Sequence, residues 1–243
     1  EPACHTPRAA HALASVARRA VRRCAACLVP SEATRRDAEE LLRLPRDRVF
    51  VTPLGVGPEF FLRNGTPKSS RPYLLAVGTL EPRKNYPRLI RAFRRVAARR
   101  PGLELRIAGK RGWLCDDVVE ACGGPVRLVG HLGEEELREQ LAGATAVLYP
   151  SLREGFGLPV LEALAAGAPV LTSDRSPLRE LAGDAALLVD PESEEAIAAG
   201  IERLVEDESL RAALGARGPA RARGYTWEAC AAATLKAYEA VLS

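Results

Sequence analysis

The chain has 243 residues, 47% of them hydrophobic and 27% charged, with a formal net charge of +4, which is typical of a soluble globular protein with one large domain or two small ones. No apolar stretch reaches the length of a membrane span, and the six scattered cysteines complete no zinc-ligand set, so reduced thiols and a cytoplasmic location are predicted. Aromatic residues make up only 5% and are not interleaved with the basic segments, which argues against nucleic-acid binding.

The first 70 residues contain too few strands for a complete sheet. A basic helix is predicted over residues 9–27, a brief strand over 28–30 and another strand over 49–53. Ser31 is placed to cap a helix over 32–42. Residues 64–72 have the Gly, Pro and Ser content of a linker. We therefore divide the chain into 1–68, a partial segment with its linker, and 69–243, a complete domain.

From residue 71 onward, short apolar strands alternate with amphipathic helices. Strands are expected at 73–78, 103–109, 126–130, 144–149, 169–172 and 186–190. Helices are expected at 85–99, 113–122, 133–141, 159–167, 193–206 (capped by Ser193) and 227–242. This alternation predicts an α/β fold, a Rossmann-like parallel sheet of six strands with helices on both faces.

Four predicted strands end in loops that contain glycine together with charged or polar residues. These loops begin at Gly78-Thr79, at Gly109-Lys110, at Gly130-His131-Leu132 and after Tyr149. Ligands of open parallel sheets bind outside the carboxyl ends of the strands, so the four loops should line one edge. Cations, backbone N–H groups and two acids at one edge are the profile of a nucleotide-sugar site.

The loop after Tyr149 contains two glutamates eight positions apart, Glu154 and Glu162. Gly155 and Gly157 lack a Cβ, so a ligand can approach their backbone closely. Pro159 suits a helix start, and a helix N-terminus favours phosphate; Glu162 is expected in the first turn. Both glutamates could accept hydrogen bonds from sugar or ribose hydroxyls. The alternatives are a solvated charge for Glu154 and a helix-dipole partner for Glu162. A glycosidase pair would not call for a phosphate-type turn.

Arginines form two clusters. Seven lie between Arg8 and Arg36, a stretch with a single acid, Glu32. The second cluster is Arg94, Arg95, Arg99 and Arg100. Such clusters suit anionic lipid at the inner membrane face, or a phosphate-bearing acceptor; the alternative is a solvated helix face.

A family resemblance rests on four segments. They are G-T-L-E-P-R-K-N (78–85), E-G-F-G-L-P-V-L-E (154–162), S-x-x-x-E-L-A-G-D-A-A-L-L-V-D-P (176–191), and C-L-V-P-S-E-A-T-R-R-D followed by V-F-V-T-P-L-G-V-G-P-E-F-F. The chain resembles the donor half of the family-4 (group 1) retaining glycosyltransferases of the GT-B fold, and the match covers nearly the whole chain. The resemblance implies that residues 1–68 are the remnant of the acceptor-side N-terminal domain, and that 69–243 are the nucleotide-sugar-binding domain with a final crossover helix.

The same resemblance implies roles for individual residues. Lys84 would neutralise the donor diphosphate, while Glu154 would bind the transferred sugar and Glu162 the ribose. The backbone of Gly155, Phe156, Gly157 and Leu158 would hold the distal phosphate or sugar hydroxyls. Gly78 and Thr79 would line the donor site, and the base would lie against Gly130, His131 and Leu132. The family often has an arginine at the position of Thr79, and Arg83 would compensate for it as a catalytic cation.

The implied activity is transfer of a hexose from a nucleotide sugar, GDP-mannose-like or a UDP-sugar, to a glycan or lipid-linked acceptor in cell-envelope polysaccharide biosynthesis. No D-x-D pattern is present, so neither a metal nor another cofactor is expected. Two alternatives stay open: a nucleotide-sugar-binding module that works with a partner chain, and an epimerase or phosphorylase of the same fold.

Overall fold

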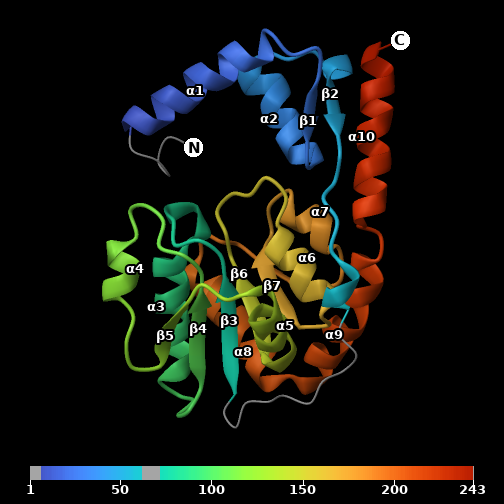
Figure 1. Ribbon diagram of the computed structural model, residues 1–243. Helices are drawn as coiled ribbons and strands as arrows, with labels where there is room; N and C mark the ends of the chain where they lie inside the picture. The colour runs from blue at the N-terminus through green and yellow to red at the C-terminus, as the bar shows by residue number, and fades with distance from the viewer. Residues whose placement is uncertain (1–6, 62–71, 243) are drawn as a thin grey trace. The chain divides into compact units, whose positions relative to one another are not determined.

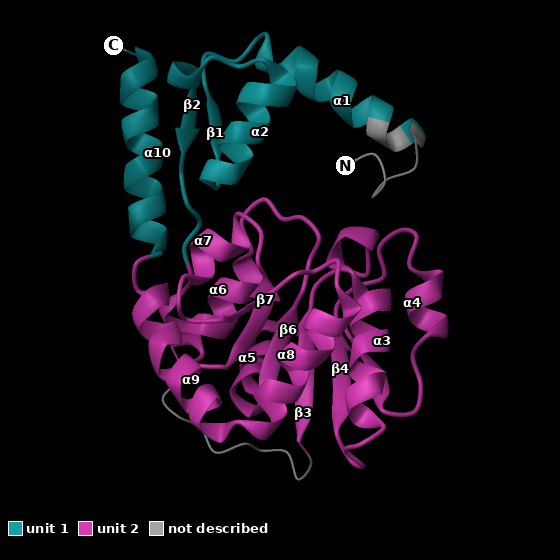
Figure 2. Ribbon diagram, turned by 180° about the vertical axis from the view of Figure 1, so that it is seen from behind, with its two compact units in different colours: residues 1–55, 225–243 teal, residues 56–224 magenta. Residues whose placement is uncertain are grey.

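The computed structural model describes residues 7–61 and 72–242 and separates into two compact units, residues 1–55 with 225–243 and residues 56–224 (Figure 2). This grouping differs from the predicted division at residue 68, and it assigns the last helix to the first unit. The chain re-enters that unit directly beside Gly55, where a Cβ would lie 2.2 Å from the backbone nitrogen of Trp227. The predicted linker, 64–72, lies almost wholly outside the described residues.

The second unit is built on six parallel strands in the order β5-β4-β3-β6-β7-β8. The predicted Rossmann-like sheet is therefore confirmed. The strands are β3 (Tyr73–Val77), β4 (Glu104–Ala108), β5 (Val126–Gly130), β6 (Ala146–Tyr149), β7 (Val170–Ser173) and β8 (Leu187–Val189).

Helices cover both faces of this sheet (Figures 1 and 2). They are α3 (Tyr86–Ala97), α4 (Asp116–Glu120), α5 (Glu134–Gly143), α6 (Leu158–Ala165), α7 (Leu178–Ala182), α8 (Glu194–Glu206) and α9 (Glu208–Ala222). One hydrophobic core joins strands and helices, with Leu105, Leu148, Phe93 and Ile201 among its buried members. Ser193 caps α8 as predicted, accepting a hydrogen bond from the Ala196 N–H at 3.0 Å.

Two helices of this unit differ from the sequence prediction. The helix expected over 113–122 is reduced to α4, because Leu114 adopts a left-handed backbone conformation (φ 51°) that no helix continues through. Helix α9 was not predicted at all, since its two central glycines and Pro219 lower helix propensity.

The first unit contains α1 (Pro7–Val21), β1 (Cys27–Val29), α2 (Glu32–Leu42), β2 (Val49–Val51) and α10 (Trp227–Leu242). Strands β1 and β2 pair in parallel. Ser31 caps α2 as predicted, accepting from the Thr34 N–H at 3.1 Å. Helix α1 ends at Val21, earlier than the predicted 27, where Arg48 donates to the Val21 carbonyl at 3.2 Å. No helix in the part of the chain that the structure describes has the length and apolar character of a membrane span.

Candidate functional site

The sheet changes winding direction between β3 and β6. The chain runs from β3 to β4 on one side, and from β6 to β7 on the other. Ligands of such sheets bind at the carboxyl ends of the strands beside this switch point. The two loops that leave these ends carry Arg83 and Lys84, after β3, and Glu154, after β6.

These three side chains form one ion cluster, in which Lys84 and Glu154 are buried and Arg83 is half-buried. Lys84 Nζ lies 2.8 Å from Glu154 Oε1, while Arg83 binds the other carboxylate oxygen and also pairs with Glu81. The side chains of Lys84 and Glu154 are only 7% and 6% exposed. Lys84 also donates to the Tyr149 hydroxyl, and its nitrogen lies 4.6 Å from the centre of that ring. The predicted catalytic trio is thus brought together at the switch point.

The backbone that carries the cluster is held by Asn85. Asn85 adopts a left-handed conformation (φ 63°) between the short 3-10 helix Pro82–Lys84 and α3. Its side-chain amide donates to the carbonyls of Pro150 at 3.0 Å and Pro191 at 2.7 Å. The Leu152 N–H donates to the Arg83 carbonyl at 2.8 Å. The loops after β3 and β6 are therefore tied to each other independently of the ion pairs.

Burial and charge oppose each other in this cluster. Burial alone would raise the pKa of Glu154, but the adjacent Lys84 and Arg83 cations outweigh it and lower that pKa. Burial lowers the pKa of Lys84, and Glu154 offsets this only in part. A lysine held with little water around it interacts strongly with any negative charge that reaches it.

A cavity of about 340 Å³ opens at the carboxyl ends of β3, β4 and β5. It is lined by Val77, Gly78, Thr79, Ala108, Gly109, Lys110, His131, Leu132 and Leu137. The ion cluster and the cavity adjoin at Gly78, where a Cβ would lie 3.1 Å from Lys84 Cε. Position 109 requires glycine, because a Cβ there would lie 2.0 Å from the Gly78 carbonyl oxygen. Four of the predicted donor-binding residues therefore share one cavity: Gly78, Thr79, His131 and Leu132.

The remaining predicted residues lie in the loop after β6, in α6 and at the end of β5. Gly157 has a positive φ of 107° and precedes α6, and a Cβ there would lie 2.4 Å from Leu178 Cδ2, so only glycine fits. Gly155 is exposed, Phe156 is buried, and Leu158 begins α6. Gly130 ends β5 at φ 79° and accepts from the Gly109 N–H at 2.8 Å.

Glu162 is the fifth residue of α6, so the prediction that it lies in the first helical turn was wrong. The helix begins at Leu158, one residue before the predicted Pro159, and its first turn contains no acid. Burial, with a smaller contribution from the charge of Glu134, raises the pKa of Glu162 to about 7. Glu134 begins α5, directly after the His131–Gly133 turn beside the cavity.

This raised pKa predicts a pH-dependent stability. The native carboxyl keeps its proton up to about pH 7, whereas the unfolded one releases it near its ordinary value of 4.5. The native state binds more protons in this window, so Glu162 lowers stability as pH rises through it. Glu162→Gln is expected to leave the free energy of unfolding unchanged near pH 4.5 and to raise it by about 1–3 kcal/mol at about pH 8. Urea denaturation at both pH values measures this.

Glu135→Gln is the matched control, because Glu135 is exposed on the same first turn of α5 as Glu134. The control should change stability by only a few tenths of a kcal/mol at either pH. An equal change in stability with pH for the two variants would mean that the pKa of Glu162 is not raised in the native state.

Two residues of this region, Glu81 and Tyr149, were given no role in the sequence analysis, and Lys110 was placed only in a loop at the edge of the sheet. Glu81 is buried (3% exposed) beside Arg83, Tyr149 contacts Lys84, and Lys110 lines the cavity. Each is polar and lies at or just after a strand end, and that position is the signal that could have found them. Within the described ranges, no group of three or more His, Cys, Asp or Glu side chains could hold a metal ion.

A six-stranded parallel sheet with an ion cluster at its switch point and a cavity at the carboxyl ends of β3, β4 and β5 defines the chain as a doubly wound α/β protein. The family model "Glycosyl transferases group 1" matches residues 59–221, and the chain belongs to this family of hexosyltransferases, which has the GT-B fold.

Curated relatives with similar sequences include two mannosyltransferases. The chain is 35% identical over 230 residues to "O-antigen chain mannosyltransferase B" of Escherichia coli, covering 87% of this chain and 60% of that protein. It is 32% identical over 186 residues to the "Phosphatidyl-myo-inositol mannosyltransferase" of Mycolicibacterium smegmatis, covering 74% and 48%. The chain thus spans about half of each relative's length.

Solved structures agree on the fold. Anabaena HepE, solved in complex with UDP and glucose, matches with a TM-score of 0.79 at 17% identity, covering 100% of this chain and 69% of that one. Sucrose-phosphate synthase of Thermosynechococcus elongatus matches with a TM-score of 0.77 at 24% identity, covering 94% and 61%. At these identities the likeness supports the GT-B fold alone.

Proposed function

We propose that the chain is the donor-binding part of a retaining hexosyltransferase that moves a sugar from a nucleotide sugar to a glycan or lipid-linked acceptor in cell-envelope polysaccharide biosynthesis. The observation that carries the proposal is the Arg83–Lys84–Glu154 cluster, which adjoins the cavity at Gly78. In this arrangement the buried Lys84 side chain lies beside a cavity at the carboxyl ends of the strands. Residues 1–55 would then belong to the acceptor-side domain.

In this proposal Lys84 stabilises the departing diphosphate. Breaking the glycosidic bond to phosphate leaves negative charge on the leaving oxygen, and a cation fixed beside it stabilises the transition state without rearrangement. Removing one such preorganised donor typically lowers the rate by about 10²–10³. The N-terminus of α6, at Leu158, favours a second negative group. Glu154 would orient the transferred sugar, and Glu162 would bind the ribose.

The preferred donor is a GDP-mannose-like nucleotide sugar, with a UDP-sugar as the alternative. Both mannosyltransferase relatives exceed 30% identity, and this supports a mannosyl donor. Isothermal titration of the chain with GDP, UDP and ADP tests the proposal. Binding of GDP or UDP at micromolar concentration is expected. If GDP binds more tightly than UDP, GDP-mannose is expected to bind as the donor. Absence of binding to all three nucleotides would overturn the proposal.

A second candidate is a nucleotide-sugar-binding module that acts only with a partner chain. Donor binding without sugar transfer by this chain alone would support the module. Transfer to an added acceptor would support the enzyme.

A further inference from the structure

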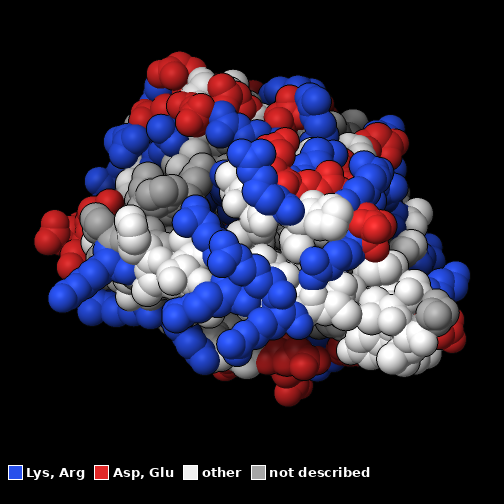
Figure 3. Space-filling model, turned by 90° about the horizontal axis from the view of Figure 1, so that it is seen from above, with Lys and Arg blue, Asp and Glu red and all other residues white. Residues whose placement is uncertain are grey.

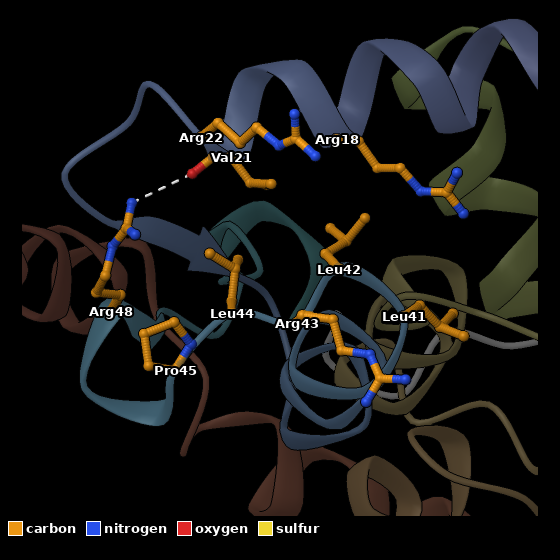
Figure 4. A pocket seen from close by; sticks show the side chains of 9 residues that line it. All are labelled: Arg18, Val21, Arg22, Leu41, Leu42, Arg43, Leu44, Pro45 and Arg48. Carbon is orange, nitrogen blue, oxygen red and sulfur yellow. Dashed lines mark hydrogen bonds between the residues drawn. The ribbon is translucent and has the colours of Figure 1, made fainter.

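Lys84 is the one buried lysine or arginine among the residues that the structure describes. Figure 3 shows Lys and Arg side chains over a broad area of one face. Arg18, Arg22 and Arg43, which line a hollow of about 500 Å³ in the first unit, are exposed (Figure 4). Water can solvate such exposed cations in many orientations, whereas the direction of a buried ammonium is set by the protein groups around it.

The ion cluster around Lys84 carries no net charge. Two cations, Lys84 and Arg83, meet two carboxylates, Glu154 and Glu81, in three ion pairs. Arg83 is bound by both carboxylates, so its charge is already matched. At close range, the attraction of such a balanced cluster for an anion depends on which N–H groups face the anion. The direction of the Lys84 ammonium therefore decides whether this cluster can bind phosphate.

The Lys84 ammonium has three N–H donors, and the protein holds two of them. One donates to Glu154 Oε1 at 2.8 Å, and another donates to the Tyr149 hydroxyl. A Cβ on Gly78 would lie 3.4 Å from the same nitrogen, and Gly78 lines the cavity of about 340 Å³. With two donors held, the third N–H is left for the side of Gly78 and the cavity.

Tyr149 is anchored in the sheet. It is the last residue of β6, it pairs with Thr172 of β7, and it is buried. The Thr172 hydroxyl donates to the Tyr149 carbonyl at 3.0 Å. Lys84, by contrast, carries its charge on a flexible four-carbon stem. The hydroxyl of the anchored ring can therefore fix the position of the ammonium.

The Tyr149 hydroxyl bonds to both members of the Lys84–Glu154 pair. Burial would raise the pKa of Glu154, but Lys84, Arg83 and a hydrogen bond with Tyr149 lower it. Burial raises the pKa of Tyr149 well above its ordinary value, so the hydroxyl that accepts from Lys84 is neutral. A change to phenylalanine removes both hydrogen bonds but keeps the ring and the net charge.

We propose that Tyr149 is a positioning residue, whose hydroxyl holds the Lys84 ammonium so that its third N–H faces the cavity and can reach a phosphate there. A tyrosine with only a packing role would not need its hydroxyl, because phenylalanine fills the same space. The identity of the phosphate ligand rests on the proposed function, whereas the orientation of Lys84 by Tyr149 does not.

NMR of protein labelled with [13Cε]lysine tests the orientation of Lys84 without any ligand. The chain has four lysines, and the loss of one resonance in Lys84→Ala assigns the signal. The titratable groups around the ammonium are Glu154, Tyr149, Arg83, Glu81 and Tyr86.

Tyr149→Phe should make Lys84 lose its proton at a lower pH than in the wild type. Burial already lowers the pKa of Lys84, and Glu154 offsets this in part. The Tyr149 hydroxyl stabilises the charged ammonium by accepting a hydrogen bond, so its removal lowers the pKa further. A residue that only fills space would leave this titration unchanged.

Tyr73→Phe is the matched control. Tyr73 is also buried, but it begins β3, at the opposite end of that strand from Gly78, and its hydroxyl donates to the Gln140 carbonyl at 2.8 Å. The control also removes one buried hydroxyl from the sheet, and the Lys84 titration should stay as in the wild type. Circular dichroism confirms that each variant is folded.

Isothermal titration with GDP and UDP measures the consequence for the ligand. Tyr149→Phe should weaken binding about 2–10-fold, the range for one neutral hydrogen bond, while Tyr73→Phe should not. In a Lys84→Ala background, Tyr149→Phe should have no further effect, because Tyr149 acts through Lys84.

Two results would overturn the proposal. One is the same Lys84 titration in Tyr149→Phe and in the wild type, and the other is an equal loss of nucleotide affinity with and without Lys84. If the wild type binds no nucleotide, the proposed function fails, and the NMR titration still decides the role of Tyr149.

Discussion

Glu154→Ala is expected to lower the free energy of unfolding by about 3–5 kcal/mol, the range for breaking a buried ion pair by removing one partner. The carboxylate is only 6% exposed and binds Lys84 on one oxygen and Arg83 on the other. Without it, Lys84 would be a buried cation facing only the Tyr149 hydroxyl and ring. Equilibrium denaturation in urea measures this loss of stability from the midpoint and the slope of the transition. The slope also reports any change in the surface that unfolding exposes.

The cycle of Glu154→Ala, Lys84→Met and the double variant isolates the pair itself. Lys84→Met alone should cost less, because Arg83 still neutralises Glu154. The double variant should be more stable than Glu154→Ala, since the uncompensated cation is gone. A Glu154→Ala protein within about 1 kcal/mol of the wild type would show that the cluster is solvated and contributes little.

Lys84→Ala is expected to weaken binding of a nucleoside diphosphate by about 10–100-fold, because a charge-assisted hydrogen bond contributes about 1.5–3 kcal/mol. The Lys84 side chain is 7% exposed and lies against Gly78, which lines the cavity, so the phosphates would meet it with little competing water. Isothermal titration with GDP or UDP measures the change. Glu162→Ala is expected to weaken binding less, since it removes hydrogen bonds to the ribose only.

Arg95→Ala provides the control for this measurement. Arg95 is a cation of the same unit, but it pairs with Glu194 and Glu195 on the α3–α8 surface and does not line the cavity. The affinity of the Arg95→Ala variant for the nucleotide should equal that of the wild type. An unchanged affinity in both Lys84→Ala and Glu162→Ala would show that this edge of the sheet does not bind the nucleotide.

Most of the strands and several helices were predictable because their patterns are local. The helix over 32–42 and the last helix, 227–242, begin and end where the sequence indicated, since Ser31 caps the first and the second is rich in alanine. Four loops were expected at one edge, and parallel pairing of the strands brings them there. The period of hydrophobic residues and the rule for open sheets were sufficient for both predictions.

Helix α9 shows what local patterns miss. Gly215 and Gly218 read as helix breakers, yet a Cβ on Gly218 would lie 2.6 Å from the Leu164 carbonyl oxygen of α6. A Cβ on Gly215 would lie 2.8 Å from the Gly167 carbonyl oxygen. The glycines are therefore needed for close packing of α9 on α6, and tertiary contact outweighs their low helix propensity.

The sequence by itself determined the parallel sheet and the residue types at the candidate site, because hydrophobic period, caps and glycine turns act within a few residues of one another. The family followed from the resemblance of four motif segments. Only the tertiary structure decided which charges meet: that Glu154 is bound by Lys84 and Arg83, and that four arginines on and just after α3 pair with glutamates of α8. Such pairing depends on distances of a few ångströms between side chains far apart in the chain, and burial then sets the strength of each charge.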